Sequence, residues 1–170
     1  MTQAVVVMGV SGCGKSTVGA AVAEALGTTL IEGDALHPAE NIAKMAAGTP
    51  LTDADRAPWL DAVADAMKHL AADDAIPVAA CSALKRAYRD RLRARSGLDI
   101  LFVHLVGSRD ALVARMKRRT GHFMPAALLD DQLATLEPPQ PDEWSLTVDM
   151  DMAPDRIAAT AAAGLSGDGR

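Results

Sequence analysis

The segment that most restricts the fold is Gly9–Ser16, GVSGCGKS, which matches the pattern G-x-x-x-x-G-K-[ST]. It follows a short apolar run at residues 4–8 and precedes a helical pattern, and the motif requires this strand, loop and helix context. Glycines allow positive φ and bring backbone N–H groups against phosphate oxygens, while the helix N-terminus adds partial positive charge. We therefore expect a loop that binds the phosphates of ATP. The predicted binding residues are Gly9, Val10, Ser11, Gly12, Cys13, Gly14, Lys15, Ser16 and Thr17.

Two side chains of this loop have predicted chemical roles. Lys15 is expected to reach the β- and γ-phosphates, and the Ser16 hydroxyl is expected to bind Mg²⁺. Phosphoryl transfer depends largely on stabilising charge in the transition state. Lys15 is therefore a candidate catalytic residue, and ATP and Mg²⁺ are the predicted cofactors.

The rest of the chain alternates between strand and helix patterns. Further apolar runs predict strands at residues 28–31, 76–80, 100–106 and 146–148. Helical spacing of apolar residues separates them, which implies parallel strands joined by right-handed crossovers. We expect an α/β protein with the three-layer α/β/α P-loop kinase fold, a central parallel sheet of about five strands and a mobile lid. The length of 170 residues predicts a single domain, 1–170.

Two polar segments do not fit simple crossover connections. Residues 34–58 are predicted to be a substrate-binding insertion, and residues 119–126 a lid. A dense group of cations, including Arg115 and Arg119, leads into the lid. Such a segment can close over ATP and place guanidinium groups against the transferred phosphoryl group, although the spacing lets only one or two of these cations face inward.

Asp34 follows the second predicted strand, and in parallel sheets ligands bind beyond the carboxyl ends of the strands. It is therefore the candidate base that accepts the proton of the acceptor hydroxyl, and a candidate Mg²⁺ ligand. The alternative is a helix N-cap or turn residue before His37. The catalytic role of Asp34 is favoured over the structural one, because the third predicted strand lacks the terminal aspartate that many P-loop proteins use near the metal. Another carboxylate must then serve there.

Several cations and histidines are candidates for binding the acceptor. Arg56, Lys85 and Arg86 stand near helix starts, where cations oppose the helix dipole and an anion-binding site explains their presence. His37 and His122 are candidate hydrogen-bonding groups. The alternative for each is an exposed cation or a structural histidine.

Composition excludes several classes of protein. The formal net charge of −5 argues against a nucleic-acid partner, although 11 of the 17 basic residues lie between Lys85 and Arg119. No apolar run approaches the roughly 20 residues of a membrane-spanning helix. Cys13 and Cys81 are interpreted as reduced, and the N-terminus lacks a basic leader, so a cytoplasmic location is expected.

Four segments resemble the gluconokinases of the small P-loop type, and together they cover most of the chain. They are GVSGCGKS at 9–16, EGDALHPAENIAKMAAGTPLTDADRAPWL at 32–60, CSALKRAYRDRLR at 81–93 and RTGHFMPAALLDDQLATLEPP at 119–139. The resemblance implies ATP-dependent conversion of D-gluconate to 6-phospho-D-gluconate, on a fold similar to shikimate and adenylate kinases that often forms a homodimer.

The resemblance also implies roles for individual residues. Residues 12–17 would bind ATP phosphates, Asp34 would be the base, and Arg115 and Arg119 would match the family's lid arginines, Arg119 being catalytic. The residues implied to line the gluconate site are Arg56, Lys85, Arg86, His122 and Gln132. Glu32 departs from the family pattern, in which an aspartate is commoner at this position.

The residues suit a carboxylated polyol as the acceptor. Cations would bind its carboxylate, and Asp34, His37 and Gln132 would bind its hydroxyls. The alternatives are a shikimate-kinase-like or other small-metabolite kinase, a nucleotide kinase and a non-catalytic nucleotide-binding switch. An aromatic content of 3% disfavours a nucleobase acceptor, because few rings are available for stacking.

Overall fold

The computed structural model describes residues 2–119 and 126–167 and contains a parallel sheet of five strands in the order β2-β3-β1-β4-β5. The strands are β1 (Gln3–Met8), β2 (Leu30–Glu32), β3 (Val78–Ala80), β4 (Asp99–Val106) and β5 (Ser145–Asp149). All four strand pairs are parallel. The predicted α/β fold with about five parallel strands is confirmed.

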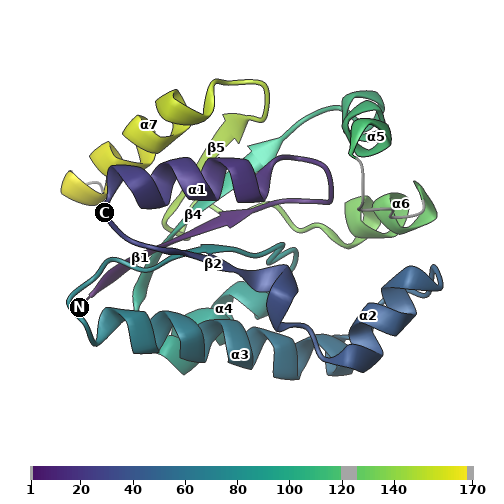
Figure 1. Ribbon diagram of the computed structural model, residues 1–170, viewed down its shortest axis with the longest axis horizontal. Coiled ribbons are helices and arrows are strands. Elements are labelled where there is room, and N and C mark those ends of the chain that lie inside the picture. The colour runs from purple at the N-terminus through teal and green to yellow at the C-terminus, as the bar shows by residue number, and fades with distance from the viewer. Residues whose placement is uncertain (1, 120–125, 168–170) are drawn as a thin grey trace.

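Helices cover both faces of this sheet. They are α1 (Lys15–Ala25), the short 3₁₀ helix η1 (Gly33–Leu36), α2 (Ala39–Ala46), α3 (Asp53–Ala71), α4 (Arg86–Ser96), α5 (Arg109–Arg118), α6 (Ala126–Thr135) and α7 (Pro154–Ser166). Helices α1 and α7 pack together on one face, and α3 and α4 pack together on the other (Figure 1). This gives three layers, with α2, α5 and α6 grouped at one end of the sheet (Figure 1).

The central position of β1 explains its continuous apolar sequence. Residues 4–8 are fully buried because β1 lies between β3 and β4 and helices cover it on both faces. Strand β2 lies at the edge of the sheet and begins at Leu30, two residues later than predicted, because its pairing with β3 starts there.

Within residues 2–119 and 126–167, no helix combines the length and apolarity needed to cross a bilayer.

The predicted insertion, residues 34–58, forms η1, α2 and the first turns of α3. Helix α3 begins after Thr52, whose Oγ1 accepts a hydrogen bond from the Asp55 amide at 3.1 Å. Asp55 Oδ2 accepts from the Thr52 amide in return, which completes a capping box. Lys44 Nζ of α2 also donates to Asp55 Oδ2 at 2.8 Å. These contacts fix α2 against the start of α3. The prediction that residues 1–170 form a single domain stays a prediction.

The predicted lid falls largely outside the described residues. Residues 120–125, including His122, are not described. Arg119 is described as the exposed C-cap of α5, and α6 begins at Ala126. The predictions of a lid and of a role for His122 therefore stay predictions.

Candidate active site

The phosphate loop connects β1 to α1 and turns through left-handed glycine conformations. Gly12 and Gly14 have φ of +84° and +97°, which residues with a Cβ rarely adopt. A Cβ on Gly12 would also lie 3.0 Å from Met116 Cγ and 3.1 Å from the Leu112 carbonyl oxygen. Helix α1 begins at Lys15, so its N-terminus adjoins the loop and can favour bound anions.

Hydrogen-bond donors of the loop are engaged by protein oxygens. Lys15 Nζ donates to the Val10 carbonyl oxygen at 3.1 Å, so its ammonium group lies back over the loop. The Ser11 amide donates to Oε1 of Gln132 at 2.7 Å, which brings α6 to the loop. The motif supplies the Ser11 amide and the Lys15 ammonium group as donors to phosphate. In this structure, the Gln132 side-chain oxygen and the Val10 carbonyl oxygen accept from them.

Residues of the loop line a larger and a smaller cavity, both formed by described residues. The larger, of about 570 Å³, is lined by Ser11 and Lys15 together with Asp34. The smaller, of about 230 Å³, is lined by Cys13, Gly14 and Thr17, by Arg115 and by the segment 150–154 that follows β5. The amide of Ser11 and the ammonium group of Lys15 thus belong to the side of the loop that faces the larger cavity.

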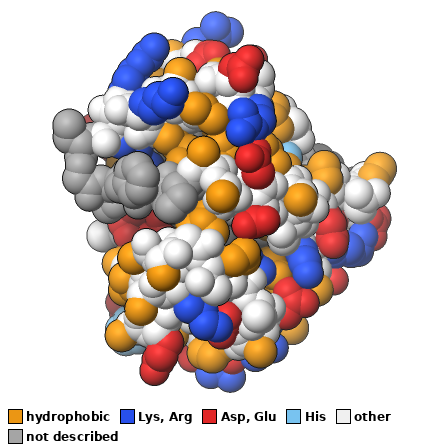
Figure 2. Space-filling view, turned by 90° about the vertical axis from the view of Figure 1, so that its right-hand side faces the viewer, with side chains coloured by type: hydrophobic (Ala, Val, Ile, Leu, Met, Phe, Trp, Pro, Cys, Tyr) orange, Lys and Arg blue, Asp and Glu red, His pale blue; other side chains and the backbone are white. Residues whose placement is uncertain are grey.

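The larger cavity collects predicted acceptor residues from distant parts of the chain. Asp34 and His37 come from η1 and its C-cap, Arg56 from α3 and Gln132 from α6. Apolar side chains of α2 complete this wall. Helices α2 and α6 lie at the same end of the molecule (Figure 1), and seen from that end, hydrophobic side chains gather beside acidic and basic ones (Figure 2).

Gly33, the residue before Asp34, lies directly against the end of β3. A Cβ on Gly33 would lie 2.4 Å from the carbonyl oxygen of Ala80, so a larger residue would force η1 away from the sheet. The Gly33 carbonyl accepts a hydrogen bond from Nε1 of the buried Trp59 at 2.7 Å. Asp34 therefore stands on a short helix that is fixed on two sides.

His37 forms part of the same wall and stacks on Trp59, with ring centroids 4.1 Å apart. Burial lowers the pKa of His37, and the nearby positive charge of Arg56 lowers it further, although Asp34 raises it. The neutral ring accepts at Nδ1 from Asn41 Nδ2 at 3.2 Å, so it carries its proton on Nε2. His37 is thus prepared to donate one hydrogen bond to a hydroxyl oxygen.

Arg56 belongs to a polar cluster that extends out of the cavity. Its Nη1 donates to the Tyr88 hydroxyl oxygen at 2.8 Å, and the Tyr88 hydroxyl in turn donates to the Asp53 carboxylate. Lys85 Nζ donates to the same carboxylate at 3.1 Å. Hydrogen bonds from Tyr88 and Lys85 lower the pKa of Asp53. A carboxylate therefore already lies between two cations that the sequence assigns to an acidic substrate.

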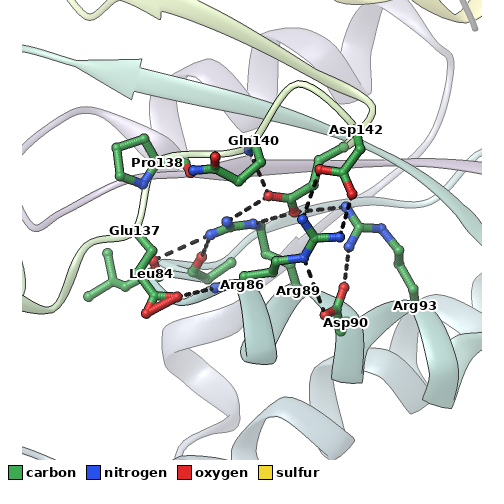
Figure 3. Close-up of polar contacts among 11 residues, drawn as sticks. Leu84, Arg86, Arg89, Asp90, Arg93, Glu137, Pro138, Gln140 and Asp142 are labelled. Atoms are coloured by element: carbon green, nitrogen blue, oxygen red, sulfur yellow. Dashed lines mark hydrogen bonds and ion pairs between the residues drawn. The ribbon is translucent and has the colours of Figure 1, made fainter.

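Three predicted site residues lie elsewhere. Neither Lys85 nor Arg86 is among the described residues that line the larger cavity. Arg86 makes a two-pronged ion pair with Asp142, with distances of 2.8 and 2.7 Å (Figure 3). Arg119 is exposed at the end of α5. Their predicted contacts with gluconate or ATP stay predictions.

Comparison with known proteins assigns the family. A family model described as an AAA domain matches residues 5–139. The gluconokinase of Gluconobacter oxydans is 52% identical over 152 residues, which cover 89% of this chain and 85% of that protein. This chain belongs to the gluconokinase family. The thermosensitive gluconokinase of Escherichia coli is 48% identical over 144 residues, covering 85% of this chain and 76% of that protein.

Solved structures agree with the membership in the gluconokinase family. A gluconokinase from Sinorhizobium meliloti superposes with a TM-score of 0.83 at 52% identity, covering 96% of this chain and 91% of that one. An unliganded sugar kinase from Janibacter superposes with a TM-score of 0.89 at 46% identity, covering 98% and 95%. The resemblance inferred from the four sequence segments is confirmed.

Glu32 contacts a predicted site residue, although the sequence analysis noted it only as a departure from the gluconokinase pattern. The Ser16 hydroxyl donates to Glu32 Oε2 at 2.9 Å, so the residue predicted to bind Mg²⁺ already contacts a carboxylate. Mg²⁺ prefers oxygen ligands and keeps several waters beside one or two carboxylates and the phosphates. The hydroxyl and the carboxylate fit such an ion. Its position two residues before Asp34, at the end of β2, is the sequence signal that could have pointed to Glu32.

The positive segment of this gluconokinase-family chain is largely paired with carboxylates. Within residues 85–119, all of which are described, eight of the eleven cations form ion pairs. They are Lys85, Arg86, Arg89, Arg91, Arg93, Arg95, Arg109 and Arg115. The clustering of cations along the sequence therefore does not become an equally concentrated positive surface.

Proposed function

We propose that this protein transfers the γ-phosphoryl group of ATP to D-gluconate and forms 6-phospho-D-gluconate and ADP. The observation that carries the proposal is that Lys15 of the phosphate loop and Asp34 line one cavity together with Arg56. Membership in the gluconokinase family, at up to 52% identity to curated gluconokinases, supports gluconate as the acceptor.

In the proposed reaction the acceptor hydroxyl oxygen of gluconate attacks the γ-phosphorus. Asp34 accepts the hydroxyl proton, and the bond between the γ-phosphorus and the bridging oxygen breaks to release ADP. Lys15 leaves the Val10 carbonyl and stabilises the negative charge that develops on the transferred group. Arg119 follows the α5 helix and is proposed to reach the same group when ATP is bound.

Magnesium has a proposed place beside the phosphate loop. Ser16, together with Glu32 or Asp34, would hold the ion through oxygen atoms, in keeping with the contact between Ser16 and Glu32. A bound Mg²⁺ supplies positive charge to the β- and γ-phosphates. The role of the protein side chains is to offer one hydroxyl and one carboxylate without crowding the phosphates.

Gluconate recognition is proposed to divide between one cation and several hydroxyl-binding groups. Arg56 binds the carboxylate with a guanidinium group whose side chain is only 13% exposed, and desolvation strengthens such a contact. Asp34, His37 and Gln132 are placed in the cavity wall where they can bind hydroxyl groups. Lys85 adds a second positive charge near Arg56, because both cations pair with the carboxylate of Asp53.

The smaller cavity is proposed to hold the nucleoside part of ATP. It opens on the opposite part of the phosphate loop and is lined by Gly14, Thr17 and Arg115. Arg115 Nη1 donates to the Cys13 carbonyl at 3.3 Å, and Nη2 donates to the Met150 carbonyl at 3.0 Å. The guanidinium group therefore links the loop to the segment that follows β5.

The deciding experiment is an assay of ADP release with gluconate, shikimate, nucleoside monophosphates or no acceptor. We expect release to depend on gluconate, with formation of 6-phosphogluconate detected by its dehydrogenase. Release with shikimate or a nucleotide alone would favour another small-metabolite kinase. Release that is independent of any acceptor would favour a nucleotide-binding switch.

A homodimer in the cytoplasm is the proposed working form. The two free cysteines, Cys13 and Cys81, are buried and fit a reducing compartment. Sedimentation velocity at micromolar concentration tests the assembly, and a monomer throughout the range would contradict it.

A further inference from the structure

A buried ion pair contacts the segment after β3 that contributes Ser82 and Leu84 to the larger cavity. Arg89 of α4 binds Glu143 with both ends of its guanidinium group, at 2.8 Å from Nε to Oε1 and 2.9 Å from Nη2 to Oε2. The two side chains are 0% and 1% exposed. Burying two charges carries a large desolvation cost, and an apolar pair of similar volume is often as stable. Stability alone is therefore a weak explanation for this pair.

Arg89 also holds the turn that follows β3. Its Nη1 donates to the carbonyl oxygens of Ala83 and Leu84, at 3.0 and 3.3 Å. Ala83 has a φ of +46°, a conformation that is costly for a residue with a Cβ and persists where surrounding contacts enforce it. The guanidinium group thus stabilises a strained turn at residues 82–85.

This turn contacts both halves of the active site. The Ser82 carbonyl accepts a hydrogen bond from the amide of Gly9, the first residue of the phosphate loop, at 3.3 Å. Ser82 and Leu84 line the larger cavity, and Lys85 follows at the N-cap of α4. A displacement of the turn would therefore change the cavity wall and the start of α4 together.

Glu143 fixes a second segment against the same turn. Its Oε2 accepts from the amide of Gln140 at 2.9 Å, and Oε1 also accepts from Arg93 Nη2 at 3.0 Å. The amide of Glu137 donates to the Leu84 carbonyl at 2.8 Å. Segment 137–143 follows α6, which carries Gln132 to the phosphate loop. The ion pair therefore joins the turn after β3 to the end of α6.

We propose that Arg89 and Glu143 are positioning residues for the acceptor site, setting the distance between the turn at 82–85 and α6. The identity of the acceptor rests on the function proposed above. Neither residue is among those that line the larger cavity, and both side chains are buried, so the effect on the acceptor comes through the position of the backbone and not through direct contact.

Arg89→Lys is the first test, because lysine keeps the charge but loses the fork of donors. We expect the KM for gluconate to rise about tenfold, whereas the KM for ATP changes less than about twofold. The matched control is Arg91→Lys on the same helix. Arg91 makes a similar pair with Asp61, at 2.7 and 2.8 Å, but is exposed on the side facing α3. The control should change neither constant. Equal effects of the two variants would overturn the proposal.

A double variant separates positioning from stability. Arg89→Met with Glu143→Met removes both charges and keeps similar volume, which should preserve the fold better than either single change. Methionine cannot donate to the Ala83 carbonyl, so the KM for gluconate should remain raised in the double variant. A normal KM in a stably folded double variant would contradict the positioning role.

Amide hydrogen exchange of the ligand-free protein gives a readout that does not depend on gluconate. In Arg89→Lys, the amides of Gly9 and Glu137 should exchange at least about tenfold faster than in the wild type, whereas Arg91→Lys should leave them unchanged. Unchanged exchange in Arg89→Lys would overturn the positioning role even if gluconate is the substrate. Failure of the wild type to phosphorylate gluconate would refute the proposed function alone.

Discussion

The phosphate loop is built from one stretch of sequence, whereas the acceptor wall, meaning the side chains that line the larger cavity outside the loop, is built from many. Eight consecutive residues, 9–16, provide the loop, and its shape follows from glycine conformations and from the start of α1. The acceptor wall combines η1, α2, α3, the turn after β3 and α6, which are separated by up to about a hundred residues in the chain. Ion pairs and hydrogen bonds hold these pieces together.

This difference has a functional consequence. A short local motif can bind the phosphates of ATP, because its glycines and the start of the following helix supply the donors. An acceptor wall made of separate elements can change its specificity by moving one of them, but each element then needs its own anchor. Changes to the loop should therefore affect transfer with any acceptor, whereas changes to the anchors should affect gluconate in particular.

The largest expected effect comes from the loop. Lys15→Ala should lower kcat by about 10²–10³-fold, because charge on the transferred phosphoryl group loses a fixed cation. Gluconate binding, measured by calorimetry without ATP, should remain within about twofold because Arg56 is unchanged. Exposed Lys68 on α3 provides a control, and Lys68→Ala should have no effect on kcat. A large loss of gluconate affinity in Lys15→Ala would show that loop and wall are not separable.

A somewhat smaller effect is expected at the junction of the two regions. Asp34→Asn should lower kcat by at least about tenfold, and by about 10²-fold if general-base catalysis has its usual value. The affinity for Mg·ATP, measured by calorimetry, should stay largely intact. Asp73→Asn, at an exposed position beyond α3, is the matched control. Full activity of Asp34→Asn would disprove its assignment as the base.

The smallest effect should appear in the pH dependence of stability. Desolvation raises the pKa of Glu143, but hydrogen bonds from Arg89, Gln140 and Arg93 outweigh it and lower the pKa to about 2 from 4.5. The folded state therefore gains stability that is complete above pH 4.5 and is lost as the pH falls toward 2.

Glu143→Gln tests this sign. The melting temperature of the wild type should fall by roughly 3 °C more than that of the variant between pH 5 and pH 3. Circular dichroism measures both transitions. Asp61→Asn, which removes the exposed pair with Arg91, should change the slope less. Parallel pH profiles for wild type and Glu143→Gln would show that the pair does not anchor the wall.

Much of the fold was predictable because its signals are local. The buried run at residues 4–8, the helical spacing in α3 and α7 and the glycines of the loop each depend on neighbours along the chain. The edge strand β2 was placed two residues too early, because its limits depend on where β3 pairs with it. Local patterns indicate that a strand exists, whereas pairing decides where it begins.

The candidate site was predictable only in part. Asp34, His37, Arg56 and Gln132 line one cavity with Lys15, and their roles toward an acceptor stay predictions. Arg86 makes an ion pair with Asp142, which lies 56 residues away in the sequence. No periodicity or motif predicts which carboxylate a given arginine will meet, since that choice depends on the packing of distant elements.

The sequence by itself determined the phosphate loop and the alternation of strands and helices, because these follow from short-range patterns of glycine, lysine and apolar residues. The gluconokinase family came from the resemblance of four sequence segments. Only the tertiary structure decided that Glu32 contacts Ser16 and that Arg89 binds Glu143. The physical reason is that a hydrogen bond depends on distance in space, and folding alone brings residues from separate elements within 3 Å of one another.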